Sequence, residues 1–165
     1  MPSNKKTAME VASAYLANRM RTAWEVRKHL KGKEFPEQEI DETVNDLIGL
    51  RYLDDYEYAK IFYERNAEKH RGSSRAMREL EEKGVDRETI KFALEDFLYE
   101  AKIDEYEMAL EIASKACDGA KEIDDRLIAK VARKLEGAGY KSGDIVRVLG
   151  EMRRWNNGRE KFEDN

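Results

Sequence analysis

The sequence has a single cysteine, Cys117, and only two prolines and ten glycines in 165 residues. One cysteine excludes an internal disulfide, which favours a reducing compartment. Because proline and glycine are scarce and 40% of the residues are charged, the composition favours long helices over sheets. We therefore expect an all-α protein in which Cys117 is a small packed side chain rather than a reactive thiol.

Long apolar runs are also missing from the sequence. No segment approaches the roughly 20 consecutive apolar residues that a membrane span needs. The first six residues include two lysines but no apolar core follows them, so they do not resemble a signal peptide. We expect a soluble, cytoplasmic protein that makes no membrane contact.

Groups for covalent chemistry or metal binding are sparse as well. The chain has two histidines, His29 and His70, and no cysteine or carboxylate is spaced to complete a metal shell with them. The adjacent Asp54 and Asp55 are typical of a helix start, where carboxylates cap the backbone and favour the helix dipole. No phosphate-binding loop and no nucleophile with a base is present. The sequence thus predicts no enzymatic activity, no metal and no cofactor.

One spacing recurs three times: a leucine, an apolar residue five positions later, and an isoleucine five positions after that. The three sets are Leu30, Phe35, Ile40; Leu80, Val85, Ile90; and Leu135, Tyr140, Ile145. In each copy the pattern predicts a helix, a short turn and a second helix, with one more amphipathic helix before them. Such a period is typical of repeat proteins, whose neighbouring units complete one another's cores.

The predicted fold class is therefore all-α, with three tandem three-helix (helix-turn-helix-like) repeats that form an elongated, curved array. We place repeat 1 at residues 8–53, repeat 2 at 54–103 and repeat 3 at 104–155, and we expect residues 156–165 to be disordered. Gly84 and Gly139 fit left-handed helix ends, whereas Glu34 at the matching position predicts a differently built turn. Thr22 and Glu25 form a capping-box pattern, and we expect the intervening Trp24 in the core.

Cationic residues gather at the same place in each repeat, although the formal net charge is −4. Residues 19–33 hold six basic residues and one acidic residue, residues 60–78 hold six and two, and residues 126–154 hold eight and three. This pattern favours a basic ridge that meets a phosphate backbone or an acidic protein groove. The alternative is that these are ordinary solvated faces, with salt bridges between neighbouring repeats.

The ridge defines a set of predicted contact residues for a protein partner or DNA. They are Arg19, Arg21, Arg27, Lys28, Lys31, Arg65, Lys69, Arg71, Arg75, Arg78, Lys130, Arg133, Lys134 and Arg147. The most pointed cluster is Arg71, Arg75 and Arg78. Gly72, Ser73 and Ser74 beside it leave free backbone N–H groups at a helix start, which predicts a seat for an anion. The alternative, which is compatible with this seat, is that Ser73 or Ser74 caps the helix.

Two segments resemble a known family. The run from Arg51 to Phe62, Arg-Tyr-Leu-Asp-Asp-Tyr-Glu-Tyr-Ala-Lys-Ile-Phe, resembles the G-Y-L-D-D-x-x-Y-A-x-x-F segment of RecX regulatory proteins, with Arg51 where the family usually has Gly. The run from Arg71 to Leu80, followed by Lys83-Gly84-Val85, resembles their next block. The three tandem three-helix units match that family's architecture.

The resemblance implies a non-enzymatic modulator of the RecA recombinase, with a role in recombination regulation, DNA repair and the SOS response. Members bind RecA, typically along the groove of its filament on single-stranded DNA, and restrain its ATPase and strand exchange; some also bind DNA. The alternative function is a helical-repeat protein that binds single- or double-stranded DNA directly. We expect a monomer.

Overall fold

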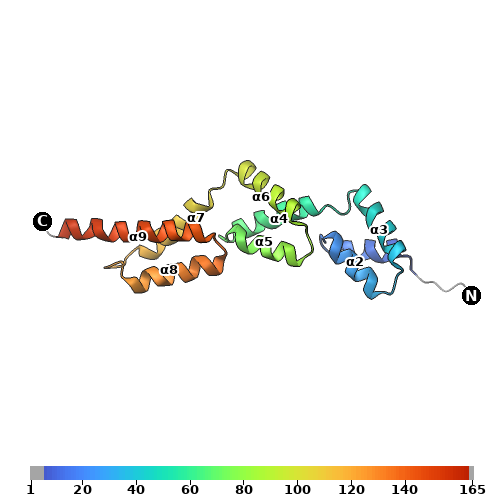
Figure 1. Cartoon of the computed structure of the whole chain (residues 1–165), viewed down its shortest axis with the longest axis horizontal. Coiled ribbons are helices and arrows are strands. Elements are labelled where there is room, and N and C mark those ends of the chain that lie inside the picture. The colour runs from blue at the N-terminus through green and yellow to red at the C-terminus, as the bar shows by residue number, and fades with distance from the viewer. Residues whose placement is uncertain (1–5, 164–165) are drawn as a thin grey trace, which may run out of the picture. The chain divides into compact units, whose positions relative to one another are not determined.

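The computed structural model describes residues 6–163, and throughout this range the regular structure is helical (Figure 1). The helices are α1 (Ala8–Leu16), α2 (Ala23–Gly32), α3 (Glu37–Gly49), α4 (Asp55–Glu68), α5 (Ser73–Glu82), α6 (Arg87–Ala101), α7 (Glu105–Cys117), α8 (Asp125–Ala138) and α9 (Ser142–Glu163). Within the described range, no helix has both the length and the apolar character to cross a bilayer. The predicted all-α fold is confirmed.

The helices belong to two compact units. Within the described range, unit 1 consists of residues 6–62 and 78–96, and unit 2 consists of residues 63–77 and 97–163. The unit boundaries therefore fall inside α4, α5 and α6, whereas the repeat boundaries that we placed at 53/54 and 103/104 fall in turns. The division into three repeats stays a prediction, because the units follow different limits.

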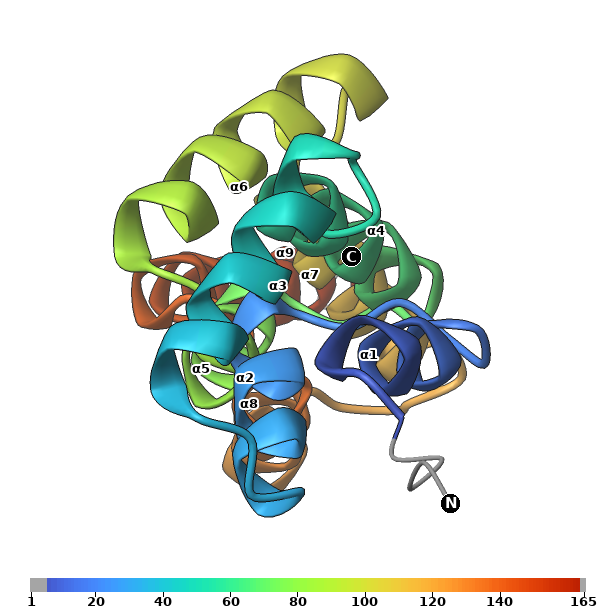
Figure 2. The same ribbon diagram turned by 90° about the vertical axis from the view of Figure 1, so that its right-hand side faces the viewer.

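In unit 1, α1, α2 and α3 surround a common core (Figure 2). Val26 and Leu30 of α2 and Val44 of α3 have no exposed surface, and Ile40 is 1% exposed. These are the positions that the helical spacing assigned to the core. The capping box is also confirmed, because the Thr22 hydroxyl accepts the Glu25 N–H and the Glu25 carboxylate accepts the Thr22 N–H.

In unit 2, α7, α8 and α9 form a second core, with α9 packed along both α7 and α8 (Figure 1). Leu135, Val148 and Met152 are fully buried in it, and Trp155 packs against its edge. Cys117 is buried there too, as predicted. Helix α9 continues through residues 156–163, part of the segment 156–165 that we expected to be disordered, and residues 164–165 lie outside the described range. The disorder of this segment stays a prediction.

The turn after the second helix of each repeat has one construction. The N–H of Phe35, Val85 or Tyr140 donates to the carbonyl of the repeat leucine, Leu30, Leu80 or Leu135, at 3.3, 3.1 and 3.1 Å. This bond brackets a left-handed residue, which is Glu34 (φ 63), Gly84 (φ 78) or Gly139 (φ 87). Our expectation of a different first turn was wrong, because Glu34 adopts the left-handed conformation despite its Cβ.

In unit 1, the start of α2 is seated on the turn that ends α5. The Thr22 hydroxyl donates to the Lys83 carbonyl at 2.6 Å, and Trp24 lies so close to Gly84 that a Cβ there would overlap the indole. Trp24 is 42% exposed despite this contact, so the prediction of a core position was wrong. The Ala23 N–H donates at 2.8 Å to the carboxylate of Asp55, the first residue of α4. Asp54 caps α4 itself through the Glu57 N–H at 3.0 Å.

In unit 2, the start of α5 is seated on the turn that ends α8 in the same way. The Gly72 N–H donates to the Ala138 carbonyl at 2.9 Å, and the Ser74 N–H donates to the Gly139 carbonyl at 3.1 Å. A carboxylate again completes the contact, because the Ser73 N–H and hydroxyl donate to Glu105, the first residue of α7, at 2.5 and 2.6 Å. We call these two contacts the helix-end junctions.

We predict that Leu80→Ala lowers the free energy of unfolding by about 2–5 kcal/mol, because Leu80 has no exposed surface and its truncation leaves a cavity. Leu50→Ala is the matched control, since Leu50 is 64% exposed and should lose less than about 0.5 kcal/mol. Urea unfolding followed by circular dichroism measures both. Equal losses in the two variants would contradict the assignment of Leu80 as a core anchor.

Gly139→Ala should destabilise the protein by more than about 2 kcal/mol, because the position is left-handed and the new Cβ would approach the Arg75 backbone nitrogen to 2.9 Å. Gly137, two residues earlier in α8, has open space around its Cβ position. Gly137→Ala should therefore be neutral or stabilising by up to about 1 kcal/mol. Thermal unfolding distinguishes the two alanines. A small loss of stability in Gly139→Ala would mean that the contact between α5 and the end of α8 rearranges at little energetic cost.

Asp55 provides a test of the unit 1 junction. Burial, which outweighs the hydrogen bond from Ala23, raises the pKa of this carboxyl group. The folded state therefore binds the proton more tightly than the unfolded state. As the pH rises from about 4 through the raised pKa, the parent should lose stability relative to Asp55→Asn.

Asp55→Ala should lower the free energy of unfolding by about 1–3 kcal/mol at every pH, since it leaves the Ala23 N–H without its acceptor. Urea unfolding at several pH values measures this. A constant difference between parent and Asn variant would contradict the raised pKa.

Candidate functional site

Unit 2 contains a cleft of about 420 Å³ in which cationic side chains predominate. Its charged and titratable lining consists of Lys69, His70, Arg71, Arg75, Glu111, Lys115 and Lys134, and Ile112, Gly137 and Ala138 complete the wall. Four of these residues, Lys69, Arg71, Arg75 and Lys134, belong to the predicted ridge. The structure thus brings together cations that lie up to 65 positions apart in the sequence, and we call this site the basic cleft.

The end of α4 presents the first cations of the basic cleft. The chain turns back through His70, whose φ of 53 is left-handed, and the N–H groups of Lys69 and Arg71 both donate to the Asn66 carbonyl. The Tyr140 hydroxyl donates to the His70 carbonyl at 3.1 Å and fixes this turn against unit 2. Burial raises the pKa of Tyr140 to about 12, so its hydroxyl stays a donor at physiological pH.

Arg75 enters the basic cleft from the first turn of α5. Its Cβ lies over Gly139, which is why that position has no room for a side chain, and its guanidinium donates to the Gly137 carbonyl at 3.3 Å. This bond satisfies one of the carbonyls at the end of α8. The unit 2 junction therefore determines where the Arg75 charge sits.

Helices α7 and α8 provide the other wall. Lys134 of α8 is exposed, and Lys115 of α7 pairs with Glu111 one turn earlier at 2.6 Å. The hydrogen bond from Lys115, and then its charge, lowers the pKa of Glu111, so this carboxylate is ionised at neutral pH. Glu111 is the single carboxylate among the described lining residues, against five cations. The cleft therefore keeps a strong positive excess even though the whole chain is acidic.

The predicted anion seat at the start of α5 is already occupied. The Ser73 N–H binds Glu105, whose side chain is only 10% exposed, and the N–H groups of Gly72 and Ser74 bind carbonyls of the α8 turn. An external anion would therefore meet the side chains of the basic cleft and not the backbone of this helix start. The prediction of a free backbone seat was wrong because the next repeat supplies the carboxylate.

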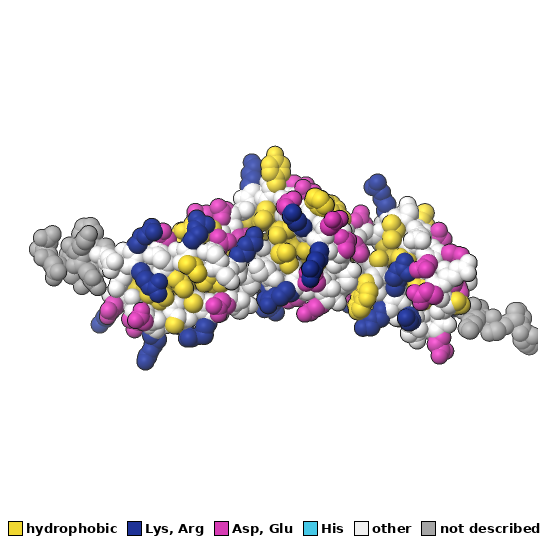
Figure 3. All heavy atoms as spheres, viewed as in Figure 1, with side chains coloured by type: hydrophobic (Ala, Val, Ile, Leu, Met, Phe, Trp, Pro, Cys, Tyr) yellow, Lys and Arg dark blue, Asp and Glu magenta, His cyan; other side chains and the backbone are white. Residues whose placement is uncertain are grey.

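The other predicted contact residues lie outside the basic cleft. Arg19 and Arg21 pair with Glu25 at 3.7 and 3.9 Å, Arg27 pairs with Asp41, and Lys28 lies over the Trp24 ring. Arg147 pairs with Asp144 and covers the Tyr106 ring, while Lys31, Arg65, Arg78, Lys130 and Arg133 are exposed. On the face shown in Figure 3, Lys and Arg side chains alternate with Asp and Glu.

Two basic residues that line the basic cleft, His70 and Lys115, were not in the predicted set. In the sequence, His70 is only one of two histidines without a metal-ligand spacing. Lys115 pairs with Glu111 as an ordinary i, i+4 helix pair would. Only the packing of α7 beside the end of α4 shows that both face the cleft. Their membership depends on a contact between repeats, which the spacing within one repeat does not encode.

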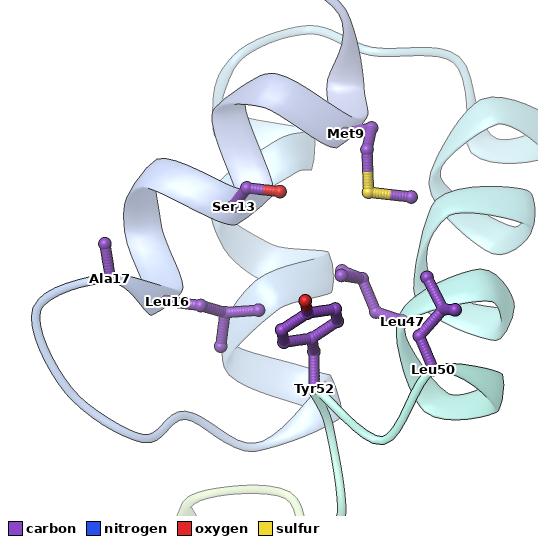
Figure 4. A pocket seen from close by; sticks show the side chains of 7 residues that line it. All are labelled: Met9, Ser13, Leu16, Ala17, Leu47, Leu50 and Tyr52. Carbon is purple, nitrogen blue, oxygen red and sulfur yellow. The ribbon is translucent and has the colours of Figure 1, made fainter.

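Unit 1 has an apolar cleft of about 430 Å³ between α1 and the end of α3 (Figure 4). Met9, Leu16 and Leu47 form its floor, with Leu50 and Tyr52 at the side.

The charge of the basic cleft suits the binding of anions. Among the described residues, no group of three His, Cys, Asp or Glu side chains could hold a metal ion. The basic cleft offers three lysine ammonium groups and the guanidinium groups of Arg71 and Arg75, which suits an anion that carries more than one negative group.

Comparison with known proteins agrees with the fold and the motifs. The family models of the first and second RecX three-helix domains match residues 8–47 and 54–94. The regulatory protein RecX of Bacillus velezensis is 39% identical over 101 residues, which cover 61% of this chain and 38% of that protein. The chain thus spans less than half the length of that relative.

A relative from Vibrio parahaemolyticus, also named regulatory protein RecX, matches almost end to end. It is 30% identical over 143 residues, which cover 87% of this chain and 90% of that protein. The crystal structure of RecX from Lactobacillus salivarius superposes with a TM-score of 0.73 at 24% identity, over 88% of this chain and 94% of that one. From the motifs, the helical fold and these relatives together, the chain belongs to the RecX family of regulatory proteins.

Proposed function

We propose that this protein is a non-enzymatic regulator that binds the RecA recombinase and its filament on single-stranded DNA, and that it inhibits or modulates ATP hydrolysis and strand exchange. The basic cleft is the observation that carries the proposal. A recombinase filament on DNA presents phosphates, and a cleft with five cations and one carboxylate complements a negatively charged surface.

The position of the cleft also fits a binding role. Its walls come from α4, α5, α7 and α8, so several helices of unit 2 hold the cations in fixed relative positions. Lys69, Lys115 and Lys134 are exposed at its rim, where they would accelerate association with a negatively charged surface. Such a protein would act by occupying the filament, and no reacting group of its own is needed. A single chain suffices for this contact, so we propose a monomer as the active form.

Direct binding to DNA is the second candidate function, and the same excess of cations favours it. The two functions differ in what they require. A DNA-binding protein should show affinity for naked single-stranded DNA that falls steeply with salt. A filament regulator should act at concentrations at which binding to naked DNA is negligible. Fluorescence anisotropy of labelled single-stranded DNA over a range of salt concentrations separates them.

We predict that Lys69→Glu/Lys134→Glu weakens the effect of this protein on ATP hydrolysis by a RecA-type recombinase about tenfold or more, because it reverses two rim charges. ATP hydrolysis on single-stranded DNA, measured with increasing amounts of the variant, gives the concentration for half of the effect. Both side chains are exposed, so the helical content by circular dichroism should not change.

The control is Lys102→Glu/Lys121→Glu, which makes the same change in net charge at two exposed lysines of unit 2 that do not line the cleft. It should retain most of the effect of the parent. Equal potency of the cleft variant and the parent would refute a role for the basic cleft. Equal weakening in both variants would mean that net charge matters and the cleft does not.

A further inference from the structure

Unit 1 holds a second cationic pocket, of about 420 Å³, between α1 and the last turn of α2. Val11, Tyr15 and Asn18 lie on one face of α1 and just beyond its end, at helical spacing. His29 lies in the last turn of α2, and Lys33 follows as the C-cap of that helix. Lys6, just ahead of α1, closes one side. No carboxylate is among the described residues that line it. We call this site the His29 pocket.

The His29 ring is held rigidly. It stacks on the Tyr15 ring with centroids 4.0 Å apart and planes 1° from parallel. The Arg21 guanidinium also lies 4.0 Å from the Tyr15 centroid, so it must cover the opposite face of that ring. Both faces of Tyr15 are therefore occupied, and a nucleobase cannot stack on it. What this pocket offers a ligand is fixed positive charge and the Asn18 amide.

The charges around His29 are predominantly positive. Lys33 and Arg21 act on it directly, and Lys6 lines the same pocket. The carboxylate of Glu25, which pairs with Arg21, also pairs with Arg19 and Lys83. Burial, followed by the charges of Lys33 and Arg21, lowers the pKa of His29. The imidazole is therefore neutral at pH 7, beside cations that would attract an anion.

We propose that the His29 pocket binds a phosphate group of a nucleotide chain, through Lys6, Lys33, Asn18 and His29, and that it binds more tightly when His29 is protonated. Phosphate suits this lining because Lys6, Asn18 and Lys33 bring several donors to one pocket, and a phosphodiester presents several acceptor oxygens to them. Base identity is not read, because the aromatic ring is covered on both sides. This inference does not depend on a recombinase.

The proton linkage has a defined sign. An anion beside His29 favours the imidazolium and raises its pKa, so binding takes up a proton when the pH lies between the pKa values of the free and bound forms. A phosphodiester keeps the same charge over this range, so any pH dependence belongs to the protein. Affinity for oligothymidylate should therefore rise as the pH falls from about 7.5 to about 5.5.

The test is an NMR titration of the histidine ring protons against pH, without ligand and with saturating oligothymidylate. The chain has only two histidines, and His29→Gln identifies the relevant signals. We expect the pKa of His29 to rise on binding, and we expect the same rise in Lys69→Glu/Lys134→Glu, whose basic cleft is altered. A His29 pKa that does not move at saturation would overturn the proposal, whatever the outcome for the recombinase.

Variants provide the second readout. Lys33→Gln should weaken oligothymidylate binding about fivefold, the effect of one unit charge near a phosphate in water, and should reduce the pKa change of His29. Lys91→Gln is the control, an exposed lysine of unit 1 that does not line the pocket. If Lys33 and His29 only offset the dipole at the end of α2, Lys33→Gln will lower stability without changing binding, and the proposal fails.

Ligand controls identify the source of the phosphate. A comparable pKa rise with inorganic phosphate would support the pocket as a general phosphate site, and a rise with oligothymidylate alone would support the nucleotide backbone as its ligand. A glutamate-rich peptide that raises the pKa of His29 as much as oligothymidylate would overturn the assignment to phosphate. Lys33→Gln in the presence of each ligand confirms that the response comes from this pocket.

Discussion

Both units are built around a helix-end junction, in which the start of one helix is seated on the left-handed turn that ends another. Backbone donors at the start of α5 meet the free carbonyls of α8, and the Thr22 hydroxyl meets the Lys83 carbonyl at the end of α5. Helix ends otherwise leave several polar groups unsatisfied, and their burial would be costly. The positive end of one helix dipole also faces the negative end of another, which favours the contact. Glycine at 84 and 139 follows from this packing, because the seated helix leaves no room for a Cβ.

The junctions also govern where charge is available for function. Asp55 and Glu105 begin the first helix of a following repeat, and each binds the start of a preceding second helix. These carboxylates satisfy the N–H groups at which a free anion would otherwise bind. Positive charge is therefore left to side chains that project beside the junctions, of which Arg75 in the basic cleft is an example. The same packing that stabilises the repeats thus leaves exposed positive charge on side chains, even though the whole chain is acidic.

The sequence was sufficient for the features that depend on local chemistry. The buried leucines and isoleucines, the capping box at Thr22, the left-handed glycines and the packed Cys117 all follow from spacing and side-chain type. It was insufficient where a second element decides the outcome. Trp24 is a large apolar side chain of the kind found in cores, but it covers Gly84. Ser73 lies at a helix start, where an anion could bind, but it binds Glu105. The basic cleft is lined by residues of different repeats. Counting charges along the sequence could therefore indicate which residues belong to it, but not that they lie together in the fold.

Glu34 distinguishes the first of the three equivalent turns from the other two. All three have a left-handed residue and the same hydrogen bond back to the repeat leucine, yet the first carries a Cβ and a carboxylate where the others carry glycine. At Gly84 and Gly139 a Cβ would overlap Trp24 or Arg75, so a seated helix start and a side chain exclude each other. A carboxylate at this turn would also repel the carboxylate that completes each junction. The turn after α2 therefore cannot receive a helix start as the turns of α5 and α8 do. That leaves the neighbouring His29 and Lys33 accessible to a ligand, since no helix is seated over the end of α2 in the part of the chain that the structure describes.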